Sequence, residues 1–156
     1  MVKILFVCLG NICRSPMAEF IMKDMVKKSG LESYFEIASA ATSDEEHGNP
    51  VYPKAAEELK KHKISCEGKT ARQIQKSDYT YYDFIVVMEK SNERDARRIL
   101  GSDPQKKIVR LLDFSEKPQD IADPWFTGRF SEVYKQIKSG CEDLLMYIVN
   151  EGLLYN

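Results

Sequence analysis

A strand, a loop and a helix are predicted in close succession at the amino terminus. Positions 2–7 form a short apolar run rich in β-branched residues, which is typical of a buried strand. Gly10-Asn11 follows and indicates a tight loop. Ser15-Pro16 is typical of a capping residue and the first position of a helix, which Gly30 ends. Such a unit is the first half of a right-handed crossover.

The same alternation continues along the chain. Further strands are predicted at 34–39, 84–88 and 108–112, and further helices at 53–62, 77–82, 91–100 and 130–148. Short apolar strands that alternate with amphipathic helices form a parallel sheet covered on both faces. The predicted fold class is α/β: a small doubly wound, flavodoxin-like sheet of four parallel strands in the order 2-1-3-4, with helices on both faces.

Composition fits one folded domain over residues 1–156, because 43% of the residues are hydrophobic and 30% are charged. The formal net charge of −1 gives no global positive field, so neither nucleic acid nor a membrane surface is an expected partner. The longest apolar run, 4–9, is far shorter than the roughly 20 residues that span a bilayer, and no leader segment precedes it. We expect a soluble, cytoplasmic protein.

Cysteines and histidines are too few and too scattered for a metal site or a disulfide scaffold. The four cysteines include no Cys-x-x-Cys pair, and the two histidines are fifteen positions apart. We therefore expect no metal and no cofactor. Catalysis by a Ser/His/Asp set is not indicated either, so a general acid is expected to be a carboxylate.

The loop after the first strand carries the clearest chemical signal. A loop of this length, followed by a helix, can direct successive backbone N–H groups and the helix N-terminus at an anion. Arg14 offers a planar fork for two phosphate oxygens, and Gly10 and Asn11 suit the positive φ that such a curl requires. The same field is expected to stabilise a Cys8 thiolate, with a hydroxyl donor at Ser15. The predicted phosphate loop consists of Cys8, Leu9, Gly10, Asn11, Ile12, Cys13, Arg14 and Ser15.

This loop predicts a covalent phosphocysteine intermediate, and a phosphate ester with a phenolic leaving group then needs a proton donor. Asp123 follows the fourth predicted strand and therefore lies at the same edge of the sheet as the loop. Pro124 stiffens its surroundings, and Trp125 and Phe126 can pack against a substrate ring. In the second step the Asp123 carboxylate would activate the water that hydrolyses the thiophosphate.

The ten-residue block from Val7 to Pro16, together with Asp123-Pro124, closely resembles the low-molecular-weight protein tyrosine phosphatases. The resemblance covers nearly the whole chain and also includes the blocks at 39–44, 48–50, 71–73 and 88–92. It implies that Cys8 is the nucleophile, Arg14 the phosphate clamp and Asp123 the proton donor. It further implies that Asn11, Ser15 and Ser39 hold the loop's shape through hydrogen bonds. Cys13 resembles the second thiol of members that form a protective disulfide with the nucleophile under oxidant.

Two departures from the family pattern concern carboxylates. Glu89 stands where the family usually has an aspartate, which leaves the role of this carboxylate open. Family members that bind their substrate between aromatic side chains often have an aromatic residue in the loop after the second strand. This sequence has Glu45 and Glu46 there, so some acidic phosphopeptides should be disfavoured. We predict that Glu45, Glu46, Trp125 and Phe126 form the substrate rim.

The predicted activity is hydrolysis of phosphotyrosine in proteins or peptides, and of small aryl phosphates, with inorganic phosphate or vanadate as competitive inhibitors. A protein arginine phosphatase of the same family is the main alternative, but Ile12 replaces the threonine of that branch and favours a flat phenyl ring. Arsenate reduction would pass a disulfide to cysteines that residues 84–100 lack. A non-catalytic phosphate-binding signalling module would need neither the thiol nor the acid.

Overall fold

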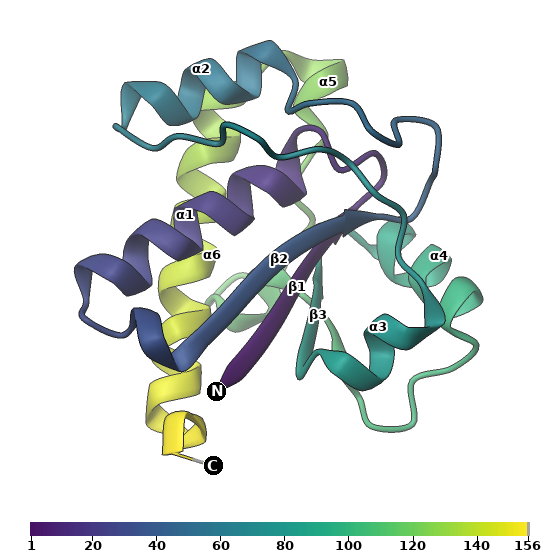
Figure 1. The fold of residues 1–156 in the computed structure, drawn as a ribbon, viewed down its shortest axis with the longest axis vertical. Helices are drawn as coiled ribbons and strands as arrows, with labels where there is room; N and C mark the ends of the chain where they lie inside the picture. Colours follow the sequence, from purple (N-terminus) through teal and green to yellow (C-terminus); the bar gives the residue numbers. More distant parts are fainter. Residues whose placement is uncertain (156) are drawn as a thin grey trace.

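The computed structural model describes residues 1–155 and contains one four-stranded sheet with helices on both of its faces (Figure 1). The strands are β1 (Val2–Cys8), β2 (Phe35–Ala41), β3 (Phe84–Val87) and β4 (Ile108–Arg110). The helices are α1 (Arg14–Lys28), α2 (Pro53–Lys61), α3 (Lys76–Tyr81), α4 (Lys90–Leu100), α5 (Pro124–Thr127) and α6 (Phe130–Asn150). Three short 3₁₀ turns are η1 (Glu32–Tyr34), η2 (Leu111–Phe114) and η3 (Leu153–Tyr155).

All strand pairs in the sheet are parallel, and their order is β2-β1-β3-β4. This confirms the predicted fold class and strand order. Helices α1 and α6 cover one face, and α3 and α4 cover the other (Figure 1). Because the strands run the same way, the ends of β1 and β3 lie side by side, and the loops that follow them share one edge of the sheet.

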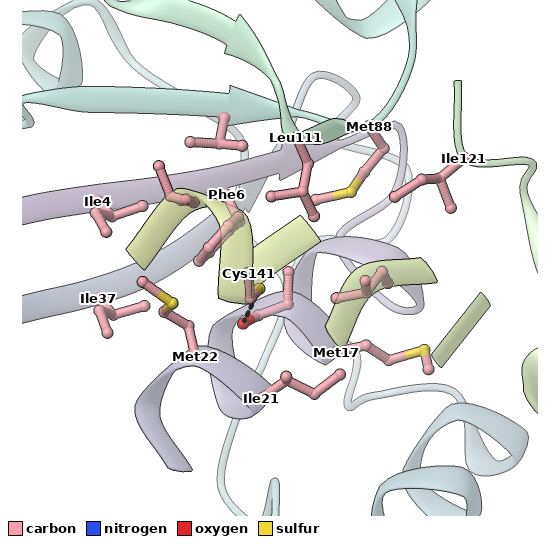
Figure 2. Close-up of a cluster of buried hydrophobic side chains, with 14 of the residues drawn as sticks. Ile4, Phe6, Met17, Ile21, Met22, Ile37, Met88, Leu111, Ile121 and Cys141 are labelled. Atoms are coloured by element: carbon pink, nitrogen blue, oxygen red, sulfur yellow. Dashed lines mark hydrogen bonds between the residues drawn. The ribbon is translucent and has the colours of Figure 1, made fainter. Parts of the chain in front are cut away.

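Side chains of β1 alternate between two buried clusters, as a strand covered on both faces requires. Ile4, Phe6 and Cys8 belong to the larger cluster, under α1 and α6, whereas Leu5 and Val7 belong to the smaller one. Figure 2 shows Phe6 in the larger cluster with side chains from both helices. Cys8 therefore ends the strand on the face that α1 covers.

Several predicted boundaries were wrong by one or two residues. The second strand begins and ends later than predicted, and the fourth is shorter because Leu111 and Leu112 form a 3₁₀ turn instead. Helix α1 begins at Arg14, with Cys13 as its N-cap and no side-chain capping bond, so Ser15 is not the cap. Helix α5 was not predicted. In the described part of the chain, no helix combines the length and the apolar character needed to cross a membrane.

Candidate active site

The phosphate loop folds around the sulfur of Cys8. Backbone N–H groups of Asn11 and Ser15 donate to Cys8 Sγ at 3.3 and 3.4 Å, and Sγ lies 3.0 Å from Ser15 Oγ. Asn11 has φ of 58°, the left-handed conformation predicted for it, whereas Gly10 does not have a positive φ. The curl thus depends on Asn11 and not on the glycine, and it directs amides at a buried sulfur.

The side chain of Asn11 links the loop to β2. Its Nδ2 donates to Ser15 Oγ at 2.8 Å and to Ser39 Oγ at 2.9 Å, and its Oδ1 accepts from the backbone N–H of Arg72 at 3.3 Å. Asn11, Ser15 and Ser39 are all buried. The three residues expected to support the loop therefore form one hydrogen-bonded group, and it compensates the unfavourable backbone conformation of Asn11.

A largely buried ion pair between Glu19 and Lys69 adjoins this group and was not predicted from the sequence. Ser39 Oγ donates to Glu19 Oε1 at 2.6 Å, and Lys69 Nζ lies 3.3 Å from the same oxygen and donates to Ser39 O at 2.8 Å. Burial lowers the pKa of Lys69, although the neighbouring Glu19 carboxylate raises it. Glu19 shares a helix face with the buried Ser15, but this spacing does not identify Lys69 as its partner.

Arg14 lies at the start of α1 with only 1% of its surface exposed. Its Nη1 donates to the backbone carbonyl of Ile121 at 2.8 Å, and its Nη2 lies 3.3 Å from Glu89 Oε1 and 3.5 Å from Asp123 Oδ2. Glu89 is also the N-cap of α4, and its backbone N–H donates to Asn92 Oδ1 at 3.1 Å. These contacts hold the Arg14 guanidinium in place at the phosphate loop.

Asp123 is the N-cap of α5. Its Oδ1 accepts from the backbone N–H of Trp125 at 3.0 Å, while Oδ2 is directed at Arg14. A four-residue helix with proline at its first position thus holds the carboxylate in one orientation. The structure brings Asp123 and Arg14 together although they lie far apart in the sequence.

An open pocket of about 240 Å³ is lined by most of the predicted phosphate loop, by Asp123 and by the predicted rim, but not by Asn11, Ser15 or Ser39. Cys8, Cys13 and Arg14 line it together with Asp123, and the four predicted rim residues surround it. Phe126 is 78% exposed, whereas Trp125 packs against Tyr52 with 4.7 Å between the ring centroids. Ser43 also lines the pocket, and neither Ser43 nor Tyr52 was predicted.

Cys13 is buried beside the pocket, and both it and Cys8 are free thiols. Burial raises the pKa of Cys13 to about 12, and nearby negative charge at Cys8, Asp123 and Glu46 adds to this rise. Cys13 therefore stays protonated at neutral pH.

Comparison with known proteins decides the family. Residues 3–153 match the family described as low molecular weight phosphotyrosine protein phosphatase. The chain belongs to this family. Membership confirms the resemblance that the loop and Asp123-Pro124 suggested.

Two bacterial phosphatases illustrate the likeness to other family members. Low molecular weight protein-tyrosine-phosphatase YfkJ of Bacillus subtilis is 42% identical over 156 residues, which cover 99% of this chain and 100% of that protein. PtpA of Staphylococcus aureus, a phosphatase of the same description, is 35% identical over 155 residues, covering 99% of this chain and 98% of its own.

Solved structures of family members have the same fold. The crystal structure of YfkJ has a TM-score of 0.93 and covers 97% of this chain and 96% of its own. The low molecular weight protein tyrosine phosphatase of Streptococcus pyogenes has a TM-score of 0.84 at 37% identity, covering 95% of this chain and 93% of its own. The YwlE arginine phosphatase has a TM-score of 0.87 at 21% identity, over 98% of this chain and 99% of that one, so it shares the fold.

Proposed function

We propose that this chain is a metal-independent protein tyrosine phosphatase that acts through a phosphocysteine intermediate, with the whole activity in a single domain of residues 1–156. The observation that carries the proposal is the grouping of Cys8, Arg14 and Asp123 around one pocket. Two backbone amides directed at the Cys8 sulfur favour its anionic form, because hydrogen bonds to an anion stabilise it. A thiolate nucleophile, a guanidinium for the phosphate oxygens and a carboxylate for the leaving group are the parts this reaction needs.

In the first step the Cys8 thiolate attacks phosphorus. A phosphorus–sulfur bond forms, the phosphorus–oxygen bond to the tyrosine ring breaks, and protonated Asp123 gives its proton to the departing phenolic oxygen. Arg14 binds the equatorial oxygens in the transition state, and the loop amides bind the remaining phosphoryl charge. Ser15 Oγ, 3.0 Å from the sulfur, can donate to the thiolate and so assists its departure in the second step.

In the second step a water molecule attacks phosphorus on the face that tyrosine has left. The Asp123 carboxylate accepts a proton from this water, the phosphorus–sulfur bond breaks, and inorganic phosphate and the Cys8 thiolate are released. Asp123 lies at the pocket with 19% of its side chain exposed, so both the leaving group and water can reach it. One carboxylate therefore serves as acid and then as base.

The pocket walls favour an aryl phosphate. Ile12, Trp125 and Phe126 present apolar surface around the site, which suits a phenyl ring in a phosphotyrosine protein or peptide. We place the protein in the cytoplasm, because a catalytic thiol works only while it is reduced. Cys13 remains the proposed partner of Cys8 in a protective disulfide under oxidant, which peptide mapping after mild peroxide treatment would detect.

The decisive experiment compares phosphotyrosine, phosphoserine and phosphoarginine in peptides of one sequence, with EDTA present. We expect hydrolysis of the phosphotyrosine peptide, competitive inhibition by phosphate and vanadate, and loss of turnover in Cys8→Ser. The Cys8→Ser variant should still bind vanadate or phosphate, because the loop amides and Arg14 remain. Preferred cleavage of the phosphoarginine peptide would assign the chain to the alternative arginine phosphatase activity, and no cleavage of any peptide would refute an enzymatic role.

Substitution at the other two positions separates their roles. Asp123→Asn should slow cleavage of aryl phosphates most when the leaving group is poor, up to the range of about 10² to 10⁴ for general acid catalysis. Arg14→Lys should weaken phosphate binding and lower the rate, because an ammonium group does not reproduce the planar fork. Unchanged kinetics in Arg14→Lys would contradict its role as the clamp.

A further inference from the structure

The segment that leads to Asp123 is held by a second carboxylate, Asp120, outside the pocket. Asp120 Oδ1 accepts hydrogen bonds from Arg110 Nη1 at 2.8 Å and from the backbone N–H of Lys90 at 3.0 Å. Lys90 is the first residue of α4, so its amide has no partner within the helix. One carboxylate oxygen therefore connects the end of β4, the start of α4 and the approach to Asp123.

Arg110 is a firm anchor for this contact. Its side chain is only 12% exposed, and its Nε and Nη2 lie 3.1 and 3.0 Å from Asp113 Oδ1 on the other side of the guanidinium. The planar group is thus fixed from two directions, and it presents Nη1 to Asp120 with little freedom. Residues 116–120 are exposed, and the Asp120 side chain is itself 46% exposed, so its two hydrogen bonds are what attach this stretch to β4 and α4.

The chain continues from Asp120 into contacts with the site itself. The backbone N–H of Ile121 donates to Met88 O at 3.0 Å, and Ile121 O accepts from Arg14 Nη1 at 2.8 Å. The side chain of Ile121 lies in the larger buried cluster, near Met88 (Figure 2). Asp120 therefore immediately precedes the residue that contacts the phosphate clamp, and it lies three positions before the proposed acid.

We propose that Asp120 is a positioning residue that acts through Asp123, an inference that rests on the proposed phosphatase function. Its ion pair with Arg110 and its bond to Lys90 fix where the segment from Asp120 to Asp123 leaves the sheet. A carboxylic acid must meet the leaving oxygen within hydrogen-bond distance, so a small displacement of this segment lowers the efficiency of proton transfer. Cys8 is held by its own loop and should be unaffected. Arg14 should keep its contacts with Glu89 and with the carbonyl of Ile121, because Ile121 is held separately by its bond to Met88 O and by its buried side chain.

The test is the leaving-group dependence of Asp120→Ala. Phenyl phosphate has a poor leaving group that needs protonation, whereas p-nitrophenyl phosphate has a good one. We expect kcat/KM, which reports only the steps up to departure of the phenol, to fall about tenfold for phenyl phosphate and to change little for p-nitrophenyl phosphate. Inhibition by vanadate should stay as in the wild type, because Cys8 and Arg14 are intact. Equal losses on both substrates, or no loss on either, would overturn the inference.

A double-mutant cycle shows whether the effect passes through the acid. In an Asp123→Asn background, Asp120→Ala should add no further discrimination between the two substrates. A selective loss that persists without the Asp123 acid would contradict the proposal. Glu93→Ala is the matched control, because it removes an ion pair with Arg97 at 2.9 Å on α4, the helix whose first residue contacts Asp120. It should change hydrolysis of neither substrate.

Two further outcomes are distinguishable. If Asp120→Ala does not fold, Asp120→Asn retains an acceptor for the Lys90 amide while it removes the charge that pairs with Arg110, and it should show the same selective loss at smaller size. A folded Asp120→Asn without any selectivity would then refute the inference. If the wild type hydrolyses neither phosphate ester, the proposed function itself fails, and the role of Asp120 falls with it.

Discussion

The two cysteines of the phosphate loop have opposite surroundings although they lie five positions apart. Both are buried, but backbone amides donate to the sulfur of Cys8, whereas burial and nearby negative charge raise the pKa of Cys13 to about 12. We therefore expect iodoacetamide at pH 8 to leave Cys13 unmodified in the folded protein. The Cys8→Ser variant isolates this thiol, and mass spectrometry of the loop peptide measures it. Labelling at the rate seen in the guanidinium-unfolded chain would contradict the prediction.

The same thiol makes stability depend on alkaline pH. The Cys13 proton is held more tightly in the folded state than in the unfolded state, where the pKa is near the ordinary value of 9.0. Between pH 9 and about 12 the unfolded chain binds fewer protons, so the Cys13 contribution to the free energy of unfolding is intact below pH 9 and is lost as pH rises. A thiol that remains protonated also attacks slowly, so disulfide formation with Cys8 should accelerate with pH.

Charge at the proposed substrate rim predicts a preference among peptides. Glu45 and Glu46 line the pocket, and the one basic side chain among the described residues that line it, Arg14, is buried at its base. Basic residues next to phosphotyrosine should therefore raise kcat/KM relative to acidic ones, by about fivefold per exposed charge at low salt. Glu45→Gln should reduce this ratio and its salt dependence, whereas Glu142→Gln, on an exposed position of α6, should not. An unchanged ratio in Glu45→Gln would remove this residue from substrate selection.

The main residues of the candidate site could be predicted from the sequence because they lie in one short loop or beside a proline. The adjacent residues in the sequence indicate a chemical role for Asn11, Arg14 and Asp123. Glu19 and Lys69 do not, because their pairing depends on how the segment after α2 crosses back over β2. A buried ion pair between distant segments leaves no local pattern, so it emerged only from the structure.

At the scale of elements, α6 packs tightly against the turn η2 at Gly140. A Cβ added at Gly140 would lie 2.7 Å from Leu111 Cγ, in a fully buried position. Gly140→Ala should therefore lower the free energy of unfolding by about 1 to 2 kcal/mol, because the clash exceeds the gain of about 1 kcal/mol in helix propensity. Urea unfolding measures this change. Ser139→Ala, on the exposed side of the same helical turn, should leave the free energy of unfolding nearly unchanged. A more stable Gly140→Ala variant would contradict the prediction, because it would mean that Leu111 moves aside without strain.

Long periodic elements were predictable, and short ones were not. The apolar stripe of α6 and the run in β1 each repeat over enough residues to identify the element. Helix α5 has only four residues, and it exists because Asp123 caps it and Pro124 fixes its first turn. Leu111 and Leu112 are as apolar as a strand, but the side chain of Asp113 bonds back to Arg110 and turns the chain into η2.

At the scale of the whole molecule, parallel strands bring four separate segments to one edge of the sheet. The end of β1 supplies the Cys8 sulfur and the loop that follows it supplies the amides, and the N-cap of α4 after β3 supplies Glu89. The segment before α6 supplies Asp123, and the loop after β2 supplies the acidic rim. Doubly wound sheets place binding sites at this edge. Arg14, which belongs to the first segment, contacts two of the others, so phosphate that binds to Arg14 should also stabilise the fold.

Ligand binding should therefore stabilise the folded chain. Inorganic phosphate at 100 times its Kd should add about 2.7 kcal/mol to the free energy of unfolding, which corresponds to a rise in Tm of roughly 5 to 10 °C for a chain of this size. Phosphate also stabilises proteins by exclusion from their surfaces, so the shift is compared among variants at matched ionic strength. Cys8→Ser should keep the shift because the amides and Arg14 remain, whereas Arg14→Lys should lose most of it. Equal shifts in both variants would mean that phosphate does not bind at the Arg14 loop.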